Sequence, residues 1–188
     1  MRLLSVSFIT RFFTALLPLC STMLFATSSF ALASGERVDN FRLLDAAGSS
    51  HELYYFADTK ALVLMAHNSS CQSMQQSVEA LASMQASYAD QGVEFMLINS
   101  DLRDDRAAIQ SSISATSIAA PVLMDSTQII GESLGAMNAG DTLVINPNNW
   151  QVAYRGSAQS AGQAVASLVA GQSPVMTSDT TTVEQNCA

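Results

Sequence analysis

The chain has 188 residues, of which 48% are hydrophobic, and a formal net charge of −8 at pH 7. So acidic a chain repels phosphate backbones and anionic lipid headgroups, which argues against nucleic-acid binding and against a membrane-surface role. It contains no phosphate-binding loop, paired-carboxylate site or serine triad, and its two histidines offer little for hydrolytic chemistry.

Residues 1–33 have the pattern of a secretory signal peptide. Arg2 and Arg11 flank an apolar stretch rich in Phe and Leu, and residues 31–33 supply the small side chains that a signal peptidase requires. We expect cleavage before Ser34, export to the periplasm or the medium, and no membrane association afterwards. The remaining length suits one compact domain.

Two alternatives to cleavage depend on the same segment. Residues 12–30 are nearly long enough for a single-span anchor, but Pro18 and several serines and threonines dilute the apolar stretch. Lipidation of Cys20 requires a small residue before the cysteine, and Leu19 stands there.

The first part of the domain predicts a hairpin followed by a β-α-β unit. Short extended segments at residues 41–44 and 51–53 are joined by a turn-rich linker. Residues 61–66 form a continuous apolar run, which is typical of a central strand covered on both faces. A helix from about residue 73 to 91, with an apolar stripe at helical spacing, leads to a second buried strand at residues 93–98.

The second part alternates in the same way and ends in a polar segment. Asp101 can cap a helix over residues 103–115, and Asp125 or Ser126 can cap a short helix after residues 122–124. The remaining elements are a strand at 141–145, a strand at 150–154, a helix at 158–170 and a Ser/Thr-rich flexible tail at 172–188. The chain therefore divides into a signal peptide, one domain at 34–171 and the tail.

Cys71 is the strongest candidate for chemistry. It follows the apolar run and a polar turn, and it precedes the long helix, where unpaired backbone N–H groups and the helix dipole favour a thiolate. The alternative is a buried, unreactive cysteine. After signal cleavage only Cys71 and Cys187 remain, and in an oxidising compartment two thiols indicate a disulfide, a redox site or a metal site.

This order of elements resembles the thioredoxin-like fold, and within it the redoxin branch of alkyl hydroperoxide reductase and thiol-specific antioxidant (AhpC/TSA) proteins. The likeness covers about residues 35–170, with residues 61–71 similar to the active-site strand and loop of the family. It implies an α/β domain in which helices flank a central mixed sheet, with an N-terminal β-hairpin. It also implies thiol-disulfide exchange or peroxide reduction by Cys71, with no cofactor.

The chain departs from the pattern of these families at the active site. Met74 occupies the second cysteine position of C-x-x-C, so fast local resolution of a mixed disulfide is lost. In the resembling peroxidases a proline and a threonine or serine shape the peroxide pocket, and here Leu64 and Asn68 occupy those positions. Gly140 aligns with the cis-proline that faces the thiol, and because a non-proline cis bond costs about 3 kcal/mol, we expect a trans bond there.

The resemblance and the spacing suggest roles for the neighbouring residues. Asn138, Ala139 and Gly140 would form the wall facing the thiol, and an imidazolium at His67 would lower the pKa of Cys71. Cys187 is either an incidental cysteine or a resolving thiol, since the flexible tail could bring it to Cys71 in the same or a partner chain.

Two functions remain open from the sequence. The first is an exported redoxin that exchanges electrons with a redox partner protein or a small thiol. The second is a catalytically degenerate thioredoxin-like module that binds a protein partner or Cu(I), for which His67, Cys71 and Met74 would be the ligands. The sequence does not indicate an oligomeric state.

Overall fold

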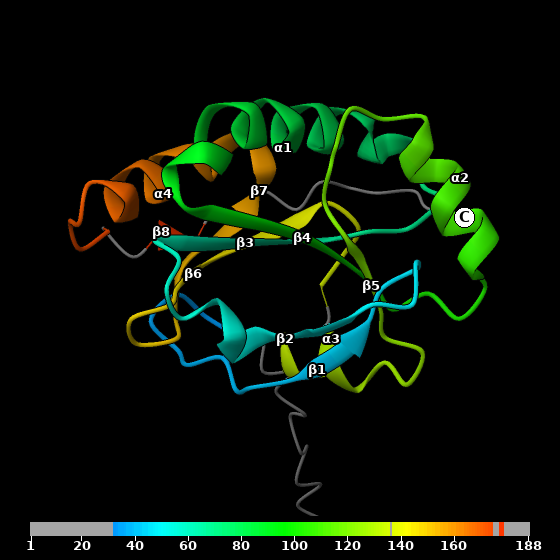
Figure 1. Ribbon diagram of the computed structural model, residues 1–188, viewed down its shortest axis with the longest axis horizontal. Coiled ribbons are helices and arrows are strands. Elements are labelled where there is room, and N and C mark those ends of the chain that lie inside the picture. Colours follow the sequence, from blue (N-terminus) through cyan, green and yellow to red (C-terminus); the bar gives the residue numbers. More distant parts are fainter. Residues whose placement is uncertain (1–31, 136, 175–176, 179–188) are drawn as a thin grey trace, which may run out of the picture.

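The computed structural model describes residues 32–135, 137–174 and 177–178. The strands of its central sheet are β3 (Ala61–Ala66), β4 (Val93–Asn99), β5 (Val122–Met124), β6 (Asp141–Asn146), β7 (Gln151–Ser157) and β8 (Thr177–Ser178). They lie in the order β5-β4-β3-β6-β7-β8. β4 is parallel to β3 and to β5, whereas β6 is antiparallel to β3 and to β7 (Figure 1).

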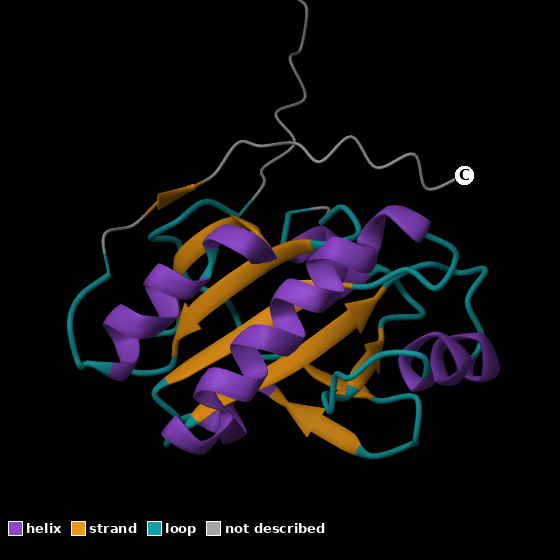
Figure 2. Ribbon diagram, turned by 90° about the horizontal axis from the view of Figure 1, so that it is seen from above, coloured by secondary structure: helices purple, strands orange, loops and turns teal. Residues whose placement is uncertain are grey.

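Two layers cover the sheet. Helices α1 (Gln75–Tyr88) and α4 (Gly162–Val169) lie on one face. The hairpin of β1 (Arg42–Leu44) and β2 (Ser50–Glu52) and the short helix α3 (Ile129–Ser133) lie on the other (Figure 1). Helix α2 (Arg106–Ser114) lies to one side of the sheet (Figure 2). The 3-10 segments are η1 (Leu53–Phe56), η2 (Gln72–Met74), η3 (Ala89–Gln91) and η4 (Ala158–Ser160).

The central strand β3 separates two hydrophobic cores. All six of its residues are buried, as the unbroken apolar run predicts for a strand covered on both faces. Val63 and Met65 belong to the core under α1 and α4, and Leu62 and Leu64 to the core under the hairpin. The predicted architecture, a mixed sheet flanked by helices with an N-terminal hairpin, is confirmed. None of the helices that the structure describes is long and apolar enough to cross a membrane.

The ends of several elements differ from the prediction. The long helix begins with the 3-10 turn η2, and α1 starts only at Gln75. Asp105 caps α2, because its side chain accepts a hydrogen bond from the N–H of Ala108 at 2.8 Å, so the prediction that Asp101 is this cap is wrong. The N-cap position of α3 is Gln128, in a left-handed conformation, and not Asp125 or Ser126, but the side chain of Asp125 does accept a hydrogen bond from the first-turn N–H of Gly131 at 2.7 Å.

Differences also occur in the last third of the chain. Trp150, predicted as the first residue of a strand, lies in the turn before β7 with φ 59°. Its ring stacks on that of Tyr54, with centroids 4.2 Å apart, and so ties this turn to η1. Within the segment predicted as a tail, β8 pairs in parallel with β7, whereas residues 179–188 lie outside the described residues.

Candidate active site

Cys71 lies directly before η2, in an extended conformation with φ −90° and ψ 100°. Only 7% of the residue is exposed, because it packs into the core beneath α1. It is disulfide-bonded. The chain's other cysteines, Cys20 and Cys187, both lie outside the described residues. The polar turn in the sequence suggested a more accessible thiol than the structure shows.

A cavity of about 370 Å³ lies beside Cys71, between the start of the α1 stretch and α2. We call it the α2 cavity. None of the described residues that line it is acidic, a lysine or an arginine. Its wall combines neutral polar and apolar side chains, which include Asn68, Gln72, Ser112, Thr116, Val78 and Ile113. Although Cys71 is buried, a reactant can approach it through an uncharged cavity.

His67 is held by two hydrogen bonds on the α2 side of the active-site loop. Its Nδ1 accepts from the amide of Asn99 at 3.1 Å, so the proton of the ring lies on Nε2. Nε2 then donates to the hydroxyl of Ser112 at 3.1 Å, and this hydroxyl donates to the carbonyl of Ile109. These contacts specify a neutral imidazole with one tautomer.

Burial acts on the charge of His67 in the same direction. The residue is 6% exposed, and desolvation lowers its pKa, with a smaller opposing effect from the carboxylate of Asp104. A protonated ring would also place an N–H against the amide donor of Asn99. The imidazolium expected from the sequence is therefore disfavoured in this fold.

The active-site loop is fastened to the loop that follows β4 by further polar contacts. Asn99 also donates to Asp104 at 2.6 Å, and Asp104 accepts from the N–H of Ser69 at 2.8 Å. The side chain of Asn68 donates to Asp101 at 2.7 Å. Asp101 also forms an ion pair with Arg103. This pair and the hydrogen bond from Asn68 lower the pKa of Asp101 to about 2. The loop that carries Cys71 is thus fixed on its α2 side.

Met74 is a core residue that also contacts the loop. It is 3% exposed, and its sulfur accepts from the backbone N–H of Asn68 at 3.3 Å. With the lone pair of His67 also engaged and Cys71 in a disulfide, all three groups of the copper hypothesis already have partners. Among the residues that the structure describes, no three His, Cys, Asp or Glu side chains are grouped to hold a metal ion.

The predicted facing loop does contact the end of β3. The N–H of Gly140 donates to the carbonyl of Ala66 at 2.8 Å. Gly140 has φ 89°, a conformation that favours glycine, and no peptide bond in the described ranges is cis. Asn138 donates through its N–H to Asp141 at 3.0 Å. The trans geometry predicted here is confirmed.

Arg155 on β7 contacts the residues on both sides of this loop. Its guanidinium donates to the carbonyls of Leu134 and Gly135, at 2.7 and 3.0 Å, where α3 ends. It also lies 3.9 Å from the carboxylate of Asp141, where β6 begins. A single cation therefore fixes both ends of the facing loop, a role for which the sequence carries no local signal.

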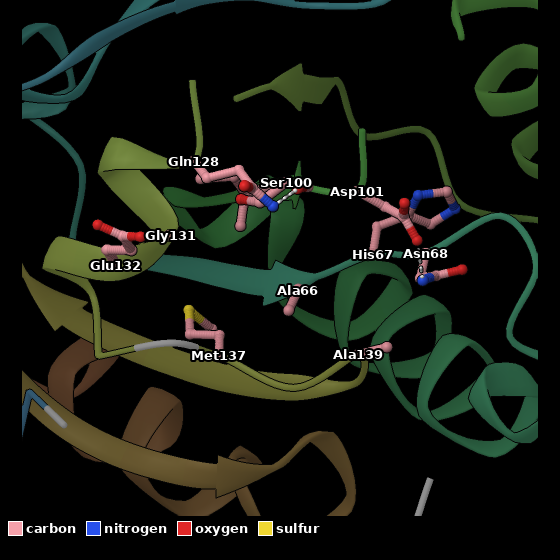
Figure 3. Close-up of a pocket in the computed structure, with 11 residues that line it drawn as sticks. Ala66, His67, Asn68, Ser100, Asp101, Gln128, Gly131, Glu132, Met137 and Ala139 are labelled. Carbon is pink, nitrogen blue, oxygen red and sulfur yellow. Dashed lines mark hydrogen bonds between the residues drawn. The ribbon is translucent and has the colours of Figure 1, made fainter. Parts of the chain in front are cut away.

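A second cavity, of about 410 Å³, lies on the opposite side of the active-site loop (Figure 3). It is bounded by the end of β3, the residues after β4, the start of α3 and the facing loop, and we call it the facing-loop cavity. Ala139 and Met137 line it, whereas Cys71 is not among its lining residues. His67 and Asn68 line both cavities, so the active-site loop is the wall between them.

The contacts that position the loop involve residues that sequence reasoning missed. Asn99 is 3% exposed in the structure. The signal that could have identified it from the sequence is a polar residue at the end of a buried strand. Ser112 and Asp104 had no such signal, because the residues of the active-site loop that they bind, His67 and Ser69, are 45 and 35 residues away in the sequence.

Comparisons with known proteins agree with this geometry. The model of the AhpC/TSA family matches residues 34–158. No curated protein matches the chain. Three solved structures of related fold are a hypothetical protein from Sinorhizobium meliloti 1021, a protein assigned as thiol:disulfide interchange protein DsbE from Chlorobium tepidum, and peroxidoxin BcpB from Mycobacterium tuberculosis.

The structural likeness is close although the sequences have diverged. The first structure has a TM-score of 0.69 and 22% identity, over 79% of this chain and 91% of that one. The second has a TM-score of 0.64 and 17% identity, over 73% and 99%. The third has a TM-score of 0.60 and 18% identity, over 74% and 97%.

The fold is thus that of the thioredoxin-like redoxins, with a cysteine at the start of the helix that follows the central strand. The chain belongs to the AhpC/TSA family, a family of thiol-based oxidoreductases, because the family model matches more than half of it.

Proposed function

We propose that the protein is an exported redoxin in which Cys71 carries out thiol-disulfide exchange. The observation that carries this proposal is the position of Cys71: it starts the helical stretch after the central strand, lines a cavity and takes part in a disulfide. A thiol that enters a disulfide at a helix start is suited to reversible oxidation.

The proposed reaction uses both cysteines of the mature chain. The Cys71 thiolate attacks one sulfur of a substrate disulfide, so that a mixed disulfide forms and the other substrate sulfur leaves as a thiolate, which takes a proton from water. The Cys187 thiolate then attacks the sulfur of Cys71 and releases the second substrate thiol. The substrate gains two electrons, and the protein is left with a Cys71–Cys187 disulfide that an external dithiol or small thiol reduces.

Cys187 is within reach of Cys71 on grounds of chain length. The residues from 179 to 187 can span up to about 30 Å beyond Ser178 when extended, which is comparable to the width of a domain of this size. Cys71 is disulfide-bonded, and the chain offers only Cys20 and Cys187 as partners within one molecule. Cleavage of the proposed signal peptide would leave Cys187 alone.

Peroxide reduction is the second form that this chemistry could take. The thiolate would then attack an O–O bond, release an alcohol or water and leave a sulfenic acid, which Cys187 converts to the same disulfide with loss of water. The geometry around the thiol favours disulfide exchange. Leu64 is fully buried in β3, and the side chain of Asn68 is committed to Asp101 and to the N–H of Ser70, so neither shapes a peroxide pocket.

A degenerate binding module is the alternative from another class of function. It is favoured by Met74, which fills the position of a local resolving cysteine with a core side chain. In that case Cys71 would be a structural disulfide cysteine, and its loss would destabilise the fold without removing any turnover.

The two functions are separated by reduction of a model disulfide, such as that of insulin, with a dithiol as the electron donor. Wild type should turn over and accumulate as an oxidised monomer 2 Da lighter than the reduced chain. Cys71→Ser should be inactive, and Cys187→Ser should stop as a mixed disulfide that mass spectrometry detects. Retained turnover in Cys71→Ser, or no turnover in a folded wild type, would overturn the proposal. Mass analysis of the exported protein tests cleavage before Ser34.

A further inference from the structure

We propose that the facing-loop cavity binds the lysine or arginine side chain of a partner polypeptide. This inference deepens the proposed function. It rests on that function only where it identifies the partner polypeptide as the disulfide substrate. The cavity is separate from the α2 cavity that leads to Cys71, and no role in the exchange reaction requires it.

The charged groups of the facing-loop cavity are carboxylates on opposite walls. Asp101 lies beyond β4, and its pKa of about 2 keeps it ionised at any physiological pH. Glu132 lies on α3 and is exposed. Beneath them, the fully buried Asp125 accepts hydrogen bonds from Ser100 and from the N–H of Gly131, both of which line the cavity. A cation that enters therefore meets the carboxylates of Asp101 and Glu132 in the lining, with Asp125 one hydrogen bond behind it.

Among the residues that the structure describes, no lysine or arginine lines the cavity. Arg103 pairs with Asp101 at 2.8 Å, but its side chain is 63% exposed and is not among the described residues that line the cavity, so Glu132 is the carboxylate of the lining without such a pair. Other arginines of the described residues are engaged elsewhere: Arg37 with Tyr54, Arg42 with Glu52, Arg106 with Ala46 and Arg155 with Leu134. Because burial keeps His67 neutral, the active-site loop adds no positive charge either.

The rest of the lining suits the aliphatic part of a basic side chain. Met137 and Ala139 from the facing loop lie across from Gln128 and Ser100, with the methionine side chain directed into the cavity (Figure 3). Ile98 and Ala66 complete the apolar part of the wall. Lysine and arginine pack their methylene groups on such surfaces while the charged end reaches a carboxylate, and a cavity of about 410 Å³ is in the size range of ligand sites.

The location of this cavity relates it to the reactive cysteine. His67 and Asn68 line both cavities, so one short loop separates a bound basic side chain from Cys71. Cys71 lines the α2 cavity and not the facing-loop cavity, so a neighbouring cysteine of the held polypeptide has to reach around the edge of this loop to meet the thiol. The cavity would thus select disulfides that lie close to a basic residue.

Binding is tested on the full mature chain with Cys71→Ser, so that no covalent capture contributes. The probes are the blocked tripeptide acetyl-Gly-Arg-Gly-amide and its citrulline analogue, which has the same shape without the charge. At low salt the arginine peptide should shift the amide resonances of Gly131 and Ala139 in a saturable way, and the citrulline peptide should bind at least threefold more weakly. Equal binding of the two peptides would overturn the proposal.

Variants locate the site. Glu132→Gln should weaken binding of the arginine peptide about two- to fivefold, the range for an exposed ion pair. Asp90→Asn, with the same loss of charge on η3 at the far end of α1, should change nothing. Met137→Lys, which places a cation inside the cavity, should abolish binding, whereas Met137→Leu should retain it. If Glu132→Gln and Met137→Lys both bind like wild type, the site lies elsewhere and the proposal is wrong.

Kinetics distinguish a failure here from a failure of the proposed function. The Cys187→Ser chain is reacted with disulfide peptides that carry arginine or citrulline beside the cysteine. A faster reaction of the arginine peptide supports both the proposed redox function and the selection of substrates by the facing-loop cavity. Equal, measurable rates overturn only the claim of substrate selection, and no reaction with either peptide overturns the redox function while the binding result stands.

Discussion

Asn99→Ala should destabilise the protein strongly although the side chain is far from the largest in the core. Asn99 is 3% exposed and makes three hydrogen bonds: to Nδ1 of His67, to the carboxylate of Asp104 and from the N–H of Asp101. The substitution leaves the buried Nδ1 of His67 without a partner, at a cost of about 1–3 kcal/mol, and removes two further bonds worth about 1 kcal/mol each. Water can partly replace the exposed ones, so we expect a loss of about 2–4 kcal/mol.

Urea unfolding, followed by circular dichroism on the oxidised chain, measures this loss. Asn148→Ala in the exposed turn before β7 is the matched control and should change the free energy of unfolding by less than about 0.5 kcal/mol. Nitrogen chemical shifts of His67 provide a second measurement, because wild type should show the Nε2–H tautomer at pH 7. A loss below about 1 kcal/mol, or an Nδ1–H tautomer in wild type, would refute the hydrogen-bond assignment.

Three further predictions concern pH and backbone conformation. Burial lowers the pKa of His67 below its usual 6.5, so the unfolded state binds a proton at a higher pH than the folded state does. The free energy of unfolding should therefore fall as the pH drops below about 6.5. In urea titrations His67→Gln should flatten this dependence. The pKa of Asp101 is also lowered, from 3.8 to about 2, so the stability advantage of wild type over Asp101→Asn should be present above about pH 4 and disappear towards pH 2; an advantage that persists at pH 2 would contradict this. Gly140→Ala should lower the free energy of unfolding by about 1–2 kcal/mol because φ is 89° there, and an unchanged melting temperature would show that the facing loop relaxes.

The fold was predictable because its strongest signals are local. The apolar run of β3 and the apolar stripe of α1 each report burial directly, and a buried strand followed by a helix and a second buried strand leaves few topologies. Element ends were less accurate. Asp101 and Asp105 both precede α2 in the sequence, and a cap cannot be chosen between them until Asn68 is seen to take Asp101 as its acceptor.

The chemistry of the site was only partly predictable, since it depends on contacts between distant segments. The sequence predicted roles for Cys71, Met74 and the facing loop, but it could not show that α2 closes over His67 through Ser112. That contact and the amide of Asn99 determine the protonation state of the ring. Position in the chain therefore indicated candidate residues, whereas burial and contacts between distant segments determine the charge that they carry.

The neutral state of His67 changes the expected origin of thiolate reactivity. Among the described residues no lysine or arginine lines the α2 cavity, so we attribute activation of Cys71 to the backbone N–H groups and the dipole of the helical stretch that follows it. In the reduced Cys187→Ser chain, the pH midpoint of iodoacetamide alkylation should then be the same with His67 and with His67→Gln. The control is Ser112→Ala, which removes a partner of the ring but no charge. A midpoint that rises in His67→Gln would mean that the ring is protonated beside the thiolate and that the imidazolium, against the burial argument, activates Cys71.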